Sequence, residues 1–459
     1  MRFRTRRTWL SRVLVLVALV VGVASSTQAA APRTSAPTTA RAAGFAVSAR
    51  VRDLASKMPP DSTIPAEWIR DNDRLPRSKG PFYPGRGEAP AAPLAETPNA
   101  MPGPSGTFAA ISADEAATVG GRFVPPDTVG DVGPNHFVQA VNTVLRVYDK
   151  DGNPLTDLVN LSTFFAPLGA GCGGQYGDPI VLYDSLADRW IVSQFGLPNG
   201  FQPPFHQCIA VSQTADPTGA FYLYDFHMPD KVNDYPHLGV WPDGYYMSDN
   251  QFTIGGSAYA GAGLLAFDRS KMLVGDPTAA YVYFDYFPID PTAGGMLPSD
   301  VDGLTPPPPG TPNLFFEFRA DEFGDPFDAL RIYEFHVDFA DPGSSTLTAR
   351  PDLPTASFDA RSPGSRACIE QPPPAGSGDG VDCIADRMMH RVAYRTLAGG
   401  VQSFVCNWTV NVSGVDPTSA ATYQAGVRFT ELRRNAVNGN MTILNQVTYA
   451  PGSGSPGTG

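Results

Sequence analysis

Charged residues are scarce in this chain, and sustained helical patterns are missing. Only 17% of the 459 residues are charged, and after the N-terminus no segment keeps a helical apolar period over fifteen residues. Glycine and proline number 46 each, and aromatic residues reach 11%. Many turn formers and aromatics with few charged runs are typical of an all-β protein.

Several catalytic signatures are also absent. The sequence has no G-x-S-x-G, no HExxH, and no CxxC or His/Cys spacing that predicts zinc. The S-x-D-x-G-x-x-W turn motif of sialidases is missing as well. The net charge of −12 argues against nucleic acid and anionic membranes as partners. The sequence therefore names no reaction directly.

The N-terminus has the pattern of an export signal. A basic region precedes the apolar run from Val13 to Val23, and Ala29–Ala31 offers small residues for cleavage. We predict a signal peptide over residues 1–31 and a secreted, extracellular or cell-surface protein. Arg6-Arg7 also fits a twin-arginine signal, so the export route stays open. An uncleaved anchor is the alternative, although the run is short for a membrane span.

Five cysteines are present, and an oxidising compartment favours disulfides. We pair Cys172 with Cys208, because they flank one proposed sheet. We pair Cys368 with Cys383, because a crosslink there closes the loop QPPPAGSGDG. Cys406 is left over, and we expect it to be a buried small apolar residue.

After the predicted signal peptide, composition divides the chain into three parts. Residues 32–115 are rich in Ala, Pro, Ser and Thr, which predicts a mostly disordered linker or pro-region. Residues 116–450 carry the strand patterns and form the predicted folded domain. Residues 451–459 are a Gly/Ser/Pro tail that we expect to be flexible.

The clearest strand pattern lies between Gly177 and Phe226. It predicts four short strands, separated by turn residues such as Asp216-Pro217-Thr218-Gly219. The strands cover Ile180–Tyr183, Trp190–Phe195, Cys208–Gln213 and Ala220–Phe226. Four antiparallel strands of this length make one blade of a β-propeller.

Related blocks recur along the chain and predict about five blades. Each block begins with an acid just before the strand expected to be innermost: Asp131, Asp178, Asp234, Asp302 and Asp386. The spacing grows from roughly fifty to roughly eighty residues, as expected when loops lengthen and strands are kept. We therefore predict an all-β propeller of four-stranded antiparallel blades.

Several long motifs carry a resemblance to a known family. They are PPDTVGDVGPNHFVQAVN, GDPIVLYDSLADRWIVSQF, QTADPTGAFYLYDF, DYPHLGVWPDGYYMSDNQF and RVAYRTL. Over roughly residues 120–450 the chain resembles secreted bacterial propeller-like surface proteins, which often carry immunoglobulin-like or fibronectin-like modules and have no established activity. The resemblance implies a propeller with a surface role and carries over no catalytic residue. In similar proteins the TYAP segment leads into further strands, so whether this ring closes stays open.

The acids before the innermost strands have two readings. In the first, which we favour, they accept backbone hydrogen bonds that tie neighbouring blades together. In the second, they line a channel mouth that binds a cation or polar ligand. Histidines and arginines occupy similar early blade positions, and convergent His, Arg and Asp side chains suit a glycan or carboxylate. The candidate ligand-binding residues are Asp131, His136, Asp178, Tyr235, His237, Asp302, Arg387 and His390.

One acidic turn is a candidate calcium site. Asp127, Asp131 and Asn135, with nearby carbonyls, offer the oxygen ligands that calcium prefers. The alternative, which we favour, is that these side chains cap turns. The run Asp149–Asn153 resembles the start of a calcium loop but lacks its terminal Glu, so we predict a hairpin turn there. Beyond possible calcium we expect no cofactor.

Three functional hypotheses follow. The first is a monomeric, non-enzymatic propeller that binds an extracellular protein or glycan at its channel face. The second is a sialidase-like glycoside hydrolase that uses acids at that face, with Tyr176, Tyr235 and Asp178 as candidates. The third is a truncated, nonfunctional copy. An enzyme needs two carboxylates about 5–10 Å apart, whereas a scaffold uses its acids in backbone hydrogen bonds.

Overall fold

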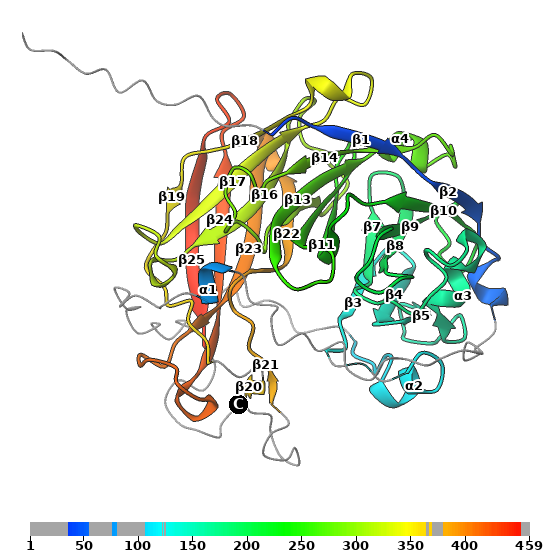
Figure 1. The fold of residues 1–459 in the computed structure, drawn as a ribbon, viewed down its shortest axis with the longest axis horizontal. Coiled ribbons are helices and arrows are strands. Elements are labelled where there is room, and N and C mark those ends of the chain that lie inside the picture. The colour runs from blue at the N-terminus through cyan, green and yellow to red at the C-terminus, as the bar shows by residue number, and fades with distance from the viewer. Residues whose placement is uncertain are drawn as a thin grey trace, which may run out of the picture. The chain divides into compact units, whose positions relative to one another are not determined.

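The structure is a computed structural model, and it describes residues 35–54, 76–79, 106–121, 123, 125–363, 367–369 and 380–450. The predicted signal peptide, the predicted tail and most of the predicted linker lie outside these residues. Within them the chain forms antiparallel sheets with a few short helices (Figure 1). No helix among these residues is both long and apolar enough to cross a bilayer.

The first blade is a four-stranded sheet. Its strands are β3 (Thr128–Val132), β4 (His136–Val141), β5 (Val144–Asp149) and β6 (Val159–Asn160). Helix α2 (Ala113–Ala117) packs against it through Ala116 and begins at Ser112 with a complete capping box. Helix α3 (Leu161–Phe165) follows β6 and buries both of its phenylalanines.

The second blade matches the sequence prediction closely and gains a strand. Its strands in chain order are β7 (Ile180–Asp184), β8 (Arg189–Gly196), β9 (His206–Ser212) and β10 (Phe221–His227). Strand β2 (Gly44–Val47) pairs with β10 at the outer edge. Figure 1 shows β2, in blue, beside β10.

The third blade is built in the same way. Its strands are β11 (Val232–Val240), β12 (Tyr245–Phe252), β13 (Tyr259–Phe267) and β14 (Ala280–Asp285), with helix α4 (Arg269–Met272) between the last two. Strand β1 (Thr38–Arg41) pairs with β14 at the outer edge. Residues 38–47 were expected to belong to the linker, and this expectation is wrong for them. They form strands because the edges of two sheets offer unpaired backbone groups.

The fourth and fifth blades share one nine-stranded sheet. The fourth contains β15 (Leu297–Val301), β16 (Asn313–Arg319), β17 (Ala329–His336), β18 (Thr346–Ala349) and β19 (Leu353–Pro354). The fifth contains β22 (Met388–Leu397), β23 (Val401–Asn411), β24 (Ala425–Arg434) and β25 (Met441–Tyr449). A parallel pairing of β15 with β22 joins them, so the prediction of separate four-stranded blades fails here.

Minor elements complete the described residues. A small hairpin pairs β20 (Ala367–Ile369) with β21 (Val381–Asp382). Helix α1 (Pro76–Lys79) is a single turn. Six 3-10 turns cover Val51–Asp53, Ala166–Leu168, Asp321–Phe323, Pro342–Ser344, Ala398–Gly400 and Ala420–Thr422.

The innermost strands confirm the propeller architecture. They contact one another in chain order, β3 with β7, β7 with β11, β11 with β15 and β15 with β22. The link from β22 back to β3 is electrostatic, because the Arg391 guanidinium lowers the pKa of the Asp131 carboxyl against the rise caused by burial. The five blades therefore present their first strands to a common centre.

The second and third blades bury both of their faces, and the strand alternation shows this directly. In β7, Ile180 and Leu182 pack into the core shared with the third blade, whereas Val181 packs into the core shared with the first. In β12, Tyr245 packs into the core shared with the second blade, and Tyr246 packs into the core shared with the fourth. Neighbouring strand residues point to opposite faces, so a blade between two others needs apolar residues at both.

Both predicted disulfides are confirmed. Cys172 bonds Cys208 across 5.8 Å between Cα atoms, and Cys368 bonds Cys383 across 5.6 Å. Cys406 is free and fully buried in β23, as expected.

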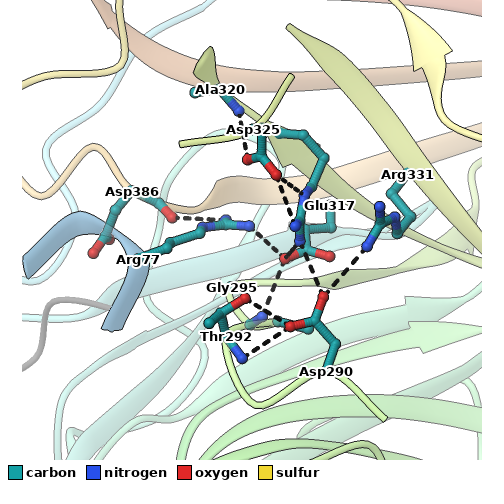
Figure 2. Close-up of polar contacts among 12 residues, drawn as sticks. Arg77, Asp290, Thr292, Gly295, Glu317, Ala320, Asp325, Arg331 and Asp386 are labelled. Atoms are coloured by element: carbon teal, nitrogen blue, oxygen red, sulfur yellow. Dashed lines mark hydrogen bonds and ion pairs between the residues drawn. The ribbon is translucent and has the colours of Figure 1, made fainter. Parts of the chain in front are cut away.

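A buried ion network ties helix α1 to the blades (Figure 2). The Arg77 guanidinium pairs with the fully buried Glu317 carboxylate and donates to the Asp386 carbonyl at 3.2 Å. Glu317 also accepts from the Tyr333 hydroxyl at 2.6 Å and the Gly294 N–H at 3.2 Å. A buried charge is stable only when it is paired and hydrogen-bonded, so Arg77 holds residues 76–79 against the fourth blade.

Removing Arg77 tests this anchor. We expect Arg77→Met to lower the free energy of unfolding by about 1–3 kcal/mol, because the buried Glu317 carboxylate loses its closest cation and keeps only Arg319, at 3.5 Å. The matched control is Arg50→Met, whose exposed pair with Asp53 contributes less than about 1 kcal/mol. Chemical denaturation measures both. Equally small losses of unfolding free energy in the two variants would contradict the role of Arg77. The double variant Arg77→Met/Glu317→Gln should recover part of the stability, because the buried charge is removed.

Candidate functional site

Corresponding positions before the innermost strands adopt a left-handed backbone. Asp127 (φ 44°) precedes β3, Asp178 (φ 45°) precedes β7 and Tyr235 (φ 53°) lies early in β11. Gly295 (φ 60°) precedes β15 in the fourth blade. In residues other than glycine such a conformation costs about 1–3 kcal/mol and persists where the surroundings hold it, often at functional sites. Three blades thus have a strained residue near this end of the innermost strand, with an acid at that position or, for Tyr235, directly before it.

Three carboxylates face one another at this end of the strands. The Asp178 carboxyl is hydrogen-bonded to Asp127, and the charges of Asp127 and Asp234 also act on it. Burial, first, and these like charges, second, raise the pKa of Asp178 well above its ordinary value of 3.8. A backbone hydrogen bond from Tyr235 opposes the rise without cancelling it. Asp178 therefore holds a proton under conditions in which an ordinary carboxyl is ionised.

The arrangement of these acids does not match a cation cage. Among the described residues, the sets of three ligand atoms within 4.8 Å of one another lie elsewhere in the fold. The Asp178 carboxyl is hydrogen-bonded to Asp127, and the charge of Asp234 also acts on it.

Two β-bulges bring a pair of histidines to the same end. The register of β11 against β12 shifts between Asp234 and His237, and that of β22 against β23 shifts between Met389 and Ala393. As a result the rings of His237 and His390 stack with centroids 5.5 Å apart. The Tyr235 ring meets His237 at 4.2 Å. Bulges re-aim side chains in this way beside many active sites.

Both histidines are neutral at pH 7. Burial lowers the pKa of His237 well below 6.5, with smaller contributions from His390 and Arg387. Burial, aided by the charge of Arg391, lowers the pKa of His390 to about 4. The Nδ1 atom of His237 is buried and finds no hydrogen-bond partner among the described residues. A neutral imidazole with an unused nitrogen can bind a ligand hydroxyl.

Arg387 contributes little free positive charge. Its guanidinium donates to the Asp386 carboxylate at 2.9 Å and lies over the Tyr235 ring at 4.9 Å. The Tyr235 hydroxyl donates to the Met388 carbonyl at 2.9 Å, and burial raises its pKa to about 12. The site is therefore rich in carboxyls and uncharged polar groups, with its arginine already paired.

Two of the predicted site acids lie at the opposite ends of their strands. Asp131, late in β3, accepts the N–H groups of Val132 at 2.7 Å and Tyr183 at 2.8 Å. Asp302, just after β15, pairs with Arg395 at 3.0 Å and Arg391 at 3.4 Å. Their oxygens are used in ties between blades, which is the structural role that the sequence also predicted.

The structure therefore divides the predicted site residues. It brings together Asp178, Tyr235, His237, Arg387 and His390. It sets Asp131 and Asp302 at the other strand ends, and it places His136 at the start of β4, opposite Asp149 on β5.

The predicted calcium ligands are not brought together either. Asp127 and Asp131 are four residues apart along extended chain, about 13 Å, and Asn135 is an exposed residue beyond β3. The Asp149 carboxylate accepts the N–H groups of Asp151 and Asn153 at 2.9 and 2.8 Å, as a hairpin turn requires. Calcium binding stays a prediction without a site among these residues.

Sequence reasoning missed how Asp127 acts. It was proposed as a metal ligand, whereas in the structure it is the hydrogen-bond partner of Asp178. The signal was available, because Asp127 lies one residue before its strand as Asp178 lies two before its own. The sequence pattern indicated Asp131 as the acid that begins the first blade, whereas Asp131 lies at the end of β3 away from the site. Asp127 is the residue that corresponds to Asp178.

Comparisons with known proteins give distant structural likenesses only. No family model and no curated sequence matches the chain. It is similar to an exo-β-1,3-galactanase from Clostridium thermocellum (8% identity, TM-score 0.33), covering 71% of this chain and 62% of that one. It is also similar to an α-L-arabinanase from Penicillium chrysogenum (12%, 0.32, covering 67% and 94%) and to a bat influenza N11 neuraminidase-like protein (8%, 0.30, covering 72% of each). Likenesses this low leave the function to be argued from the site.

The raised pKa of Asp178 predicts a pH dependence of stability. A carboxyl whose pKa is higher in the folded than in the unfolded protein stabilises the fold fully below its ordinary value of 3.8, and this stabilisation is lost as pH rises through the folded-state value. We therefore expect Asp178→Asn to gain stability relative to the unchanged protein as pH increases from 5 to 8, measured by chemical denaturation.

Asp149→Asn is the control for this titration. Hydrogen bonds from Asn153 lower the pKa of Asp149, so this carboxyl is ionised throughout the same range. Its stability difference should stay constant between pH 5 and 8. A constant difference for Asp178→Asn as well would contradict the raised pKa.

Proposed function

We propose that this protein hydrolyses glycosidic bonds, with Asp178 as the proton donor. One observation carries the proposal: Asp178 is kept protonated by burial and by the carboxylates of Asp127 and Asp234. A carboxyl group with a raised pKa beside a second carboxyl group is the arrangement that glycoside hydrolysis uses. This was the second of the hypotheses drawn from the sequence.

The three acids have different roles in the proposed reaction. The Asp178 carboxyl protonates the oxygen of the leaving sugar. Asp127 shares a hydrogen bond with Asp178 and raises its pKa, so it acts through Asp178. Asp234, which accepts the Tyr235 N–H at 3.0 Å, supplies the second carboxyl group, which activates water or attacks the sugar.

The other residues of the site favour an uncharged glycan. His237 and His390 are neutral and offer hydrogen-bonding nitrogens to sugar hydroxyls. Arg387 is already paired with Asp386, so little positive charge remains to balance an anionic sugar. The charges of Asp127 and Asp234 beside Asp178 would repel such a sugar.

Leaving-group chemistry tests the role of Asp178. The general acid matters most when the leaving sugar oxygen is strongly basic, and little when a nitrophenolate leaves. We expect Asp178→Asn to lower kcat about 10²–10⁴-fold on uncharged oligosaccharides and much less on nitrophenyl glycosides. Asp234→Asn should lower kcat on both kinds of substrate. Reducing-sugar and chromogenic assays measure the two.

The matched control is Asp188→Asn. Asp188 also has a left-handed backbone (φ 54°) but lies in the turn between β7 and β8, where it accepts the Tyr183 hydroxyl. This variant should keep full turnover. Turnover that survives Asp178→Asn would overturn the assignment.

Binding without turnover is the alternative outcome. If no uncharged glycan is cleaved while a glycan array shows binding that Asp178→Asn abolishes, the same site belongs to a glycan-binding propeller. That result would restore the first hypothesis drawn from the sequence.

A further inference from the structure

Three side chains capable of binding a metal lie together on the second blade, away from the acids described above. His206 begins β9, and His227 ends β10 directly opposite it in the antiparallel register. Asp225 lies two residues before His227, so it projects from the same face of the sheet. The strand register alone therefore gathers two imidazoles and a carboxylate.

Their distances suit a common ion. His206 Nδ1 is 2.7 Å from Asp225 Oδ1, and His227 Nε2 is 4.0 Å from Asp225 Oδ2. One ligand atom from each residue lies within 4.8 Å of the other two. In a tetrahedral site with metal–ligand distances of 2.0–2.1 Å, ligand atoms are about 3.3 Å apart. Binding an ion therefore requires the His206–Asp225 pair to separate by about 0.6 Å and the exposed His227 ring to rotate inward.

Two of the three side chains are buried, and the third is exposed. The Asp225 and His206 side chains are only 9% and 5% exposed and are hydrogen-bonded to each other through His206 Nδ1. The other ring nitrogen of His206, Nε2, is buried and has no hydrogen-bond partner among the residues that the structure describes. By contrast, the His227 side chain is 51% exposed and gives the group access to solvent.

Glycines make room around the group. A Cβ atom on Gly171 would lie 2.5 Å from Cε1 of His206, and one on Gly44 would lie 3.2 Å from Cβ of Asp225. Any side chain at Gly171 would therefore displace the His206 ring. The disulfide partner Cys208 lies opposite Asp225 in the register, and its bond to Cys172 removes the thiolate as a competing ligand.

We propose that His206, Asp225 and His227 bind a zinc ion. Two imidazole nitrogens and one carboxylate oxygen are a ligand set that zinc accepts, and a three-residue set leaves a fourth position for water. His206 and Asp225 supply a fixed, buried pair, and His227 closes the site from the solvent side.

The zinc site is distinct from the proposed hydrolytic site. Strands β9 and β10 are the third and fourth from the centre of their blade, so the ligands lie about 10–14 Å outward from β7 at the strand spacing of 4.7–4.9 Å. The zinc proposal rests on the geometry of the second blade alone. Loss of glycan turnover and loss of zinc binding can therefore be measured independently.

Calorimetry with zinc chloride tests the proposal. The full chain is stripped with chelator under non-reducing conditions, and its free thiols are counted to verify that both disulfides are intact. We expect one zinc ion to bind, and cobalt(II) in its place to give the intense visible absorption of a tetrahedral site. Loss of a ligand in His227→Ala should weaken zinc binding by more than the roughly 10–100-fold that loss of an outer-shell partner causes.

His336→Ala is the matched control. His336 is also an exposed histidine at the end of a strand, β17, and its removal should leave zinc affinity unchanged. Because His227 is exposed, its variant should fold, which circular dichroism verifies. Three results would overturn the proposal. They are no zinc binding, equal zinc binding in the unchanged protein and His227→Ala, and zinc binding only after reduction of Cys172–Cys208.

Discussion

The packing of sheet against sheet is the constraint on which the rest of this structure depends. Each inner blade lies between two neighbours, so both of its faces are removed from water and both need apolar side chains. Trp190 and Tyr224 face opposite sides of the second blade, and Tyr246 and Trp408 pack into the large core of the last three blades. Hydrophobic burial thus fills the faces and leaves polar chemistry to the strand ends.

The two ends of the innermost strands use their acids differently. At one end, Asp131 accepts backbone N–H groups and Asp300 pairs with Arg391, and these contacts partly offset the rise in pKa that burial causes in both carboxyls. At the other end, Asp178 is raised in pKa by burial and the charge of Asp127. The contacts of Asp131 and Asp300 link neighbouring blades, whereas the surroundings of Asp178 keep its carboxyl able to donate a proton.

The sequence predicted the strands of the second blade to within one or two residues, because Asp216–Gly219 and similar turns delimit short apolar runs. It predicted both disulfides from their positions relative to those strands. It did not predict that residues 38–47 form outer strands. Their own composition carries no strong strand signal, and only the open edges of β10 and β14 give them partners.

The candidate site was predicted in part. Tyr235, His237 and His390 were chosen for their early positions in the blades, and the structure brings them together. The bulges that aim them were not foreseen, because a shift of register depends on the partner strand and leaves little trace in local sequence. The zinc ligands were missed for a related reason: His206 and His227 are 21 residues apart in the sequence and become neighbours only through the register of β9 with β10.

The sequence by itself determined the all-β class, the blade repeat and the cysteine pairs, since alternating apolar residues, turn formers and spacing are local properties. Tertiary structure alone decided which acids meet. Asp127 and Asp131 are near neighbours in sequence, yet an extended strand carries them to opposite ends, where Asp127 meets Asp178 and Asp131 lies near Arg391. Burial and neighbouring charge set the pKa of a carboxyl, and both arise only when separate blades come together.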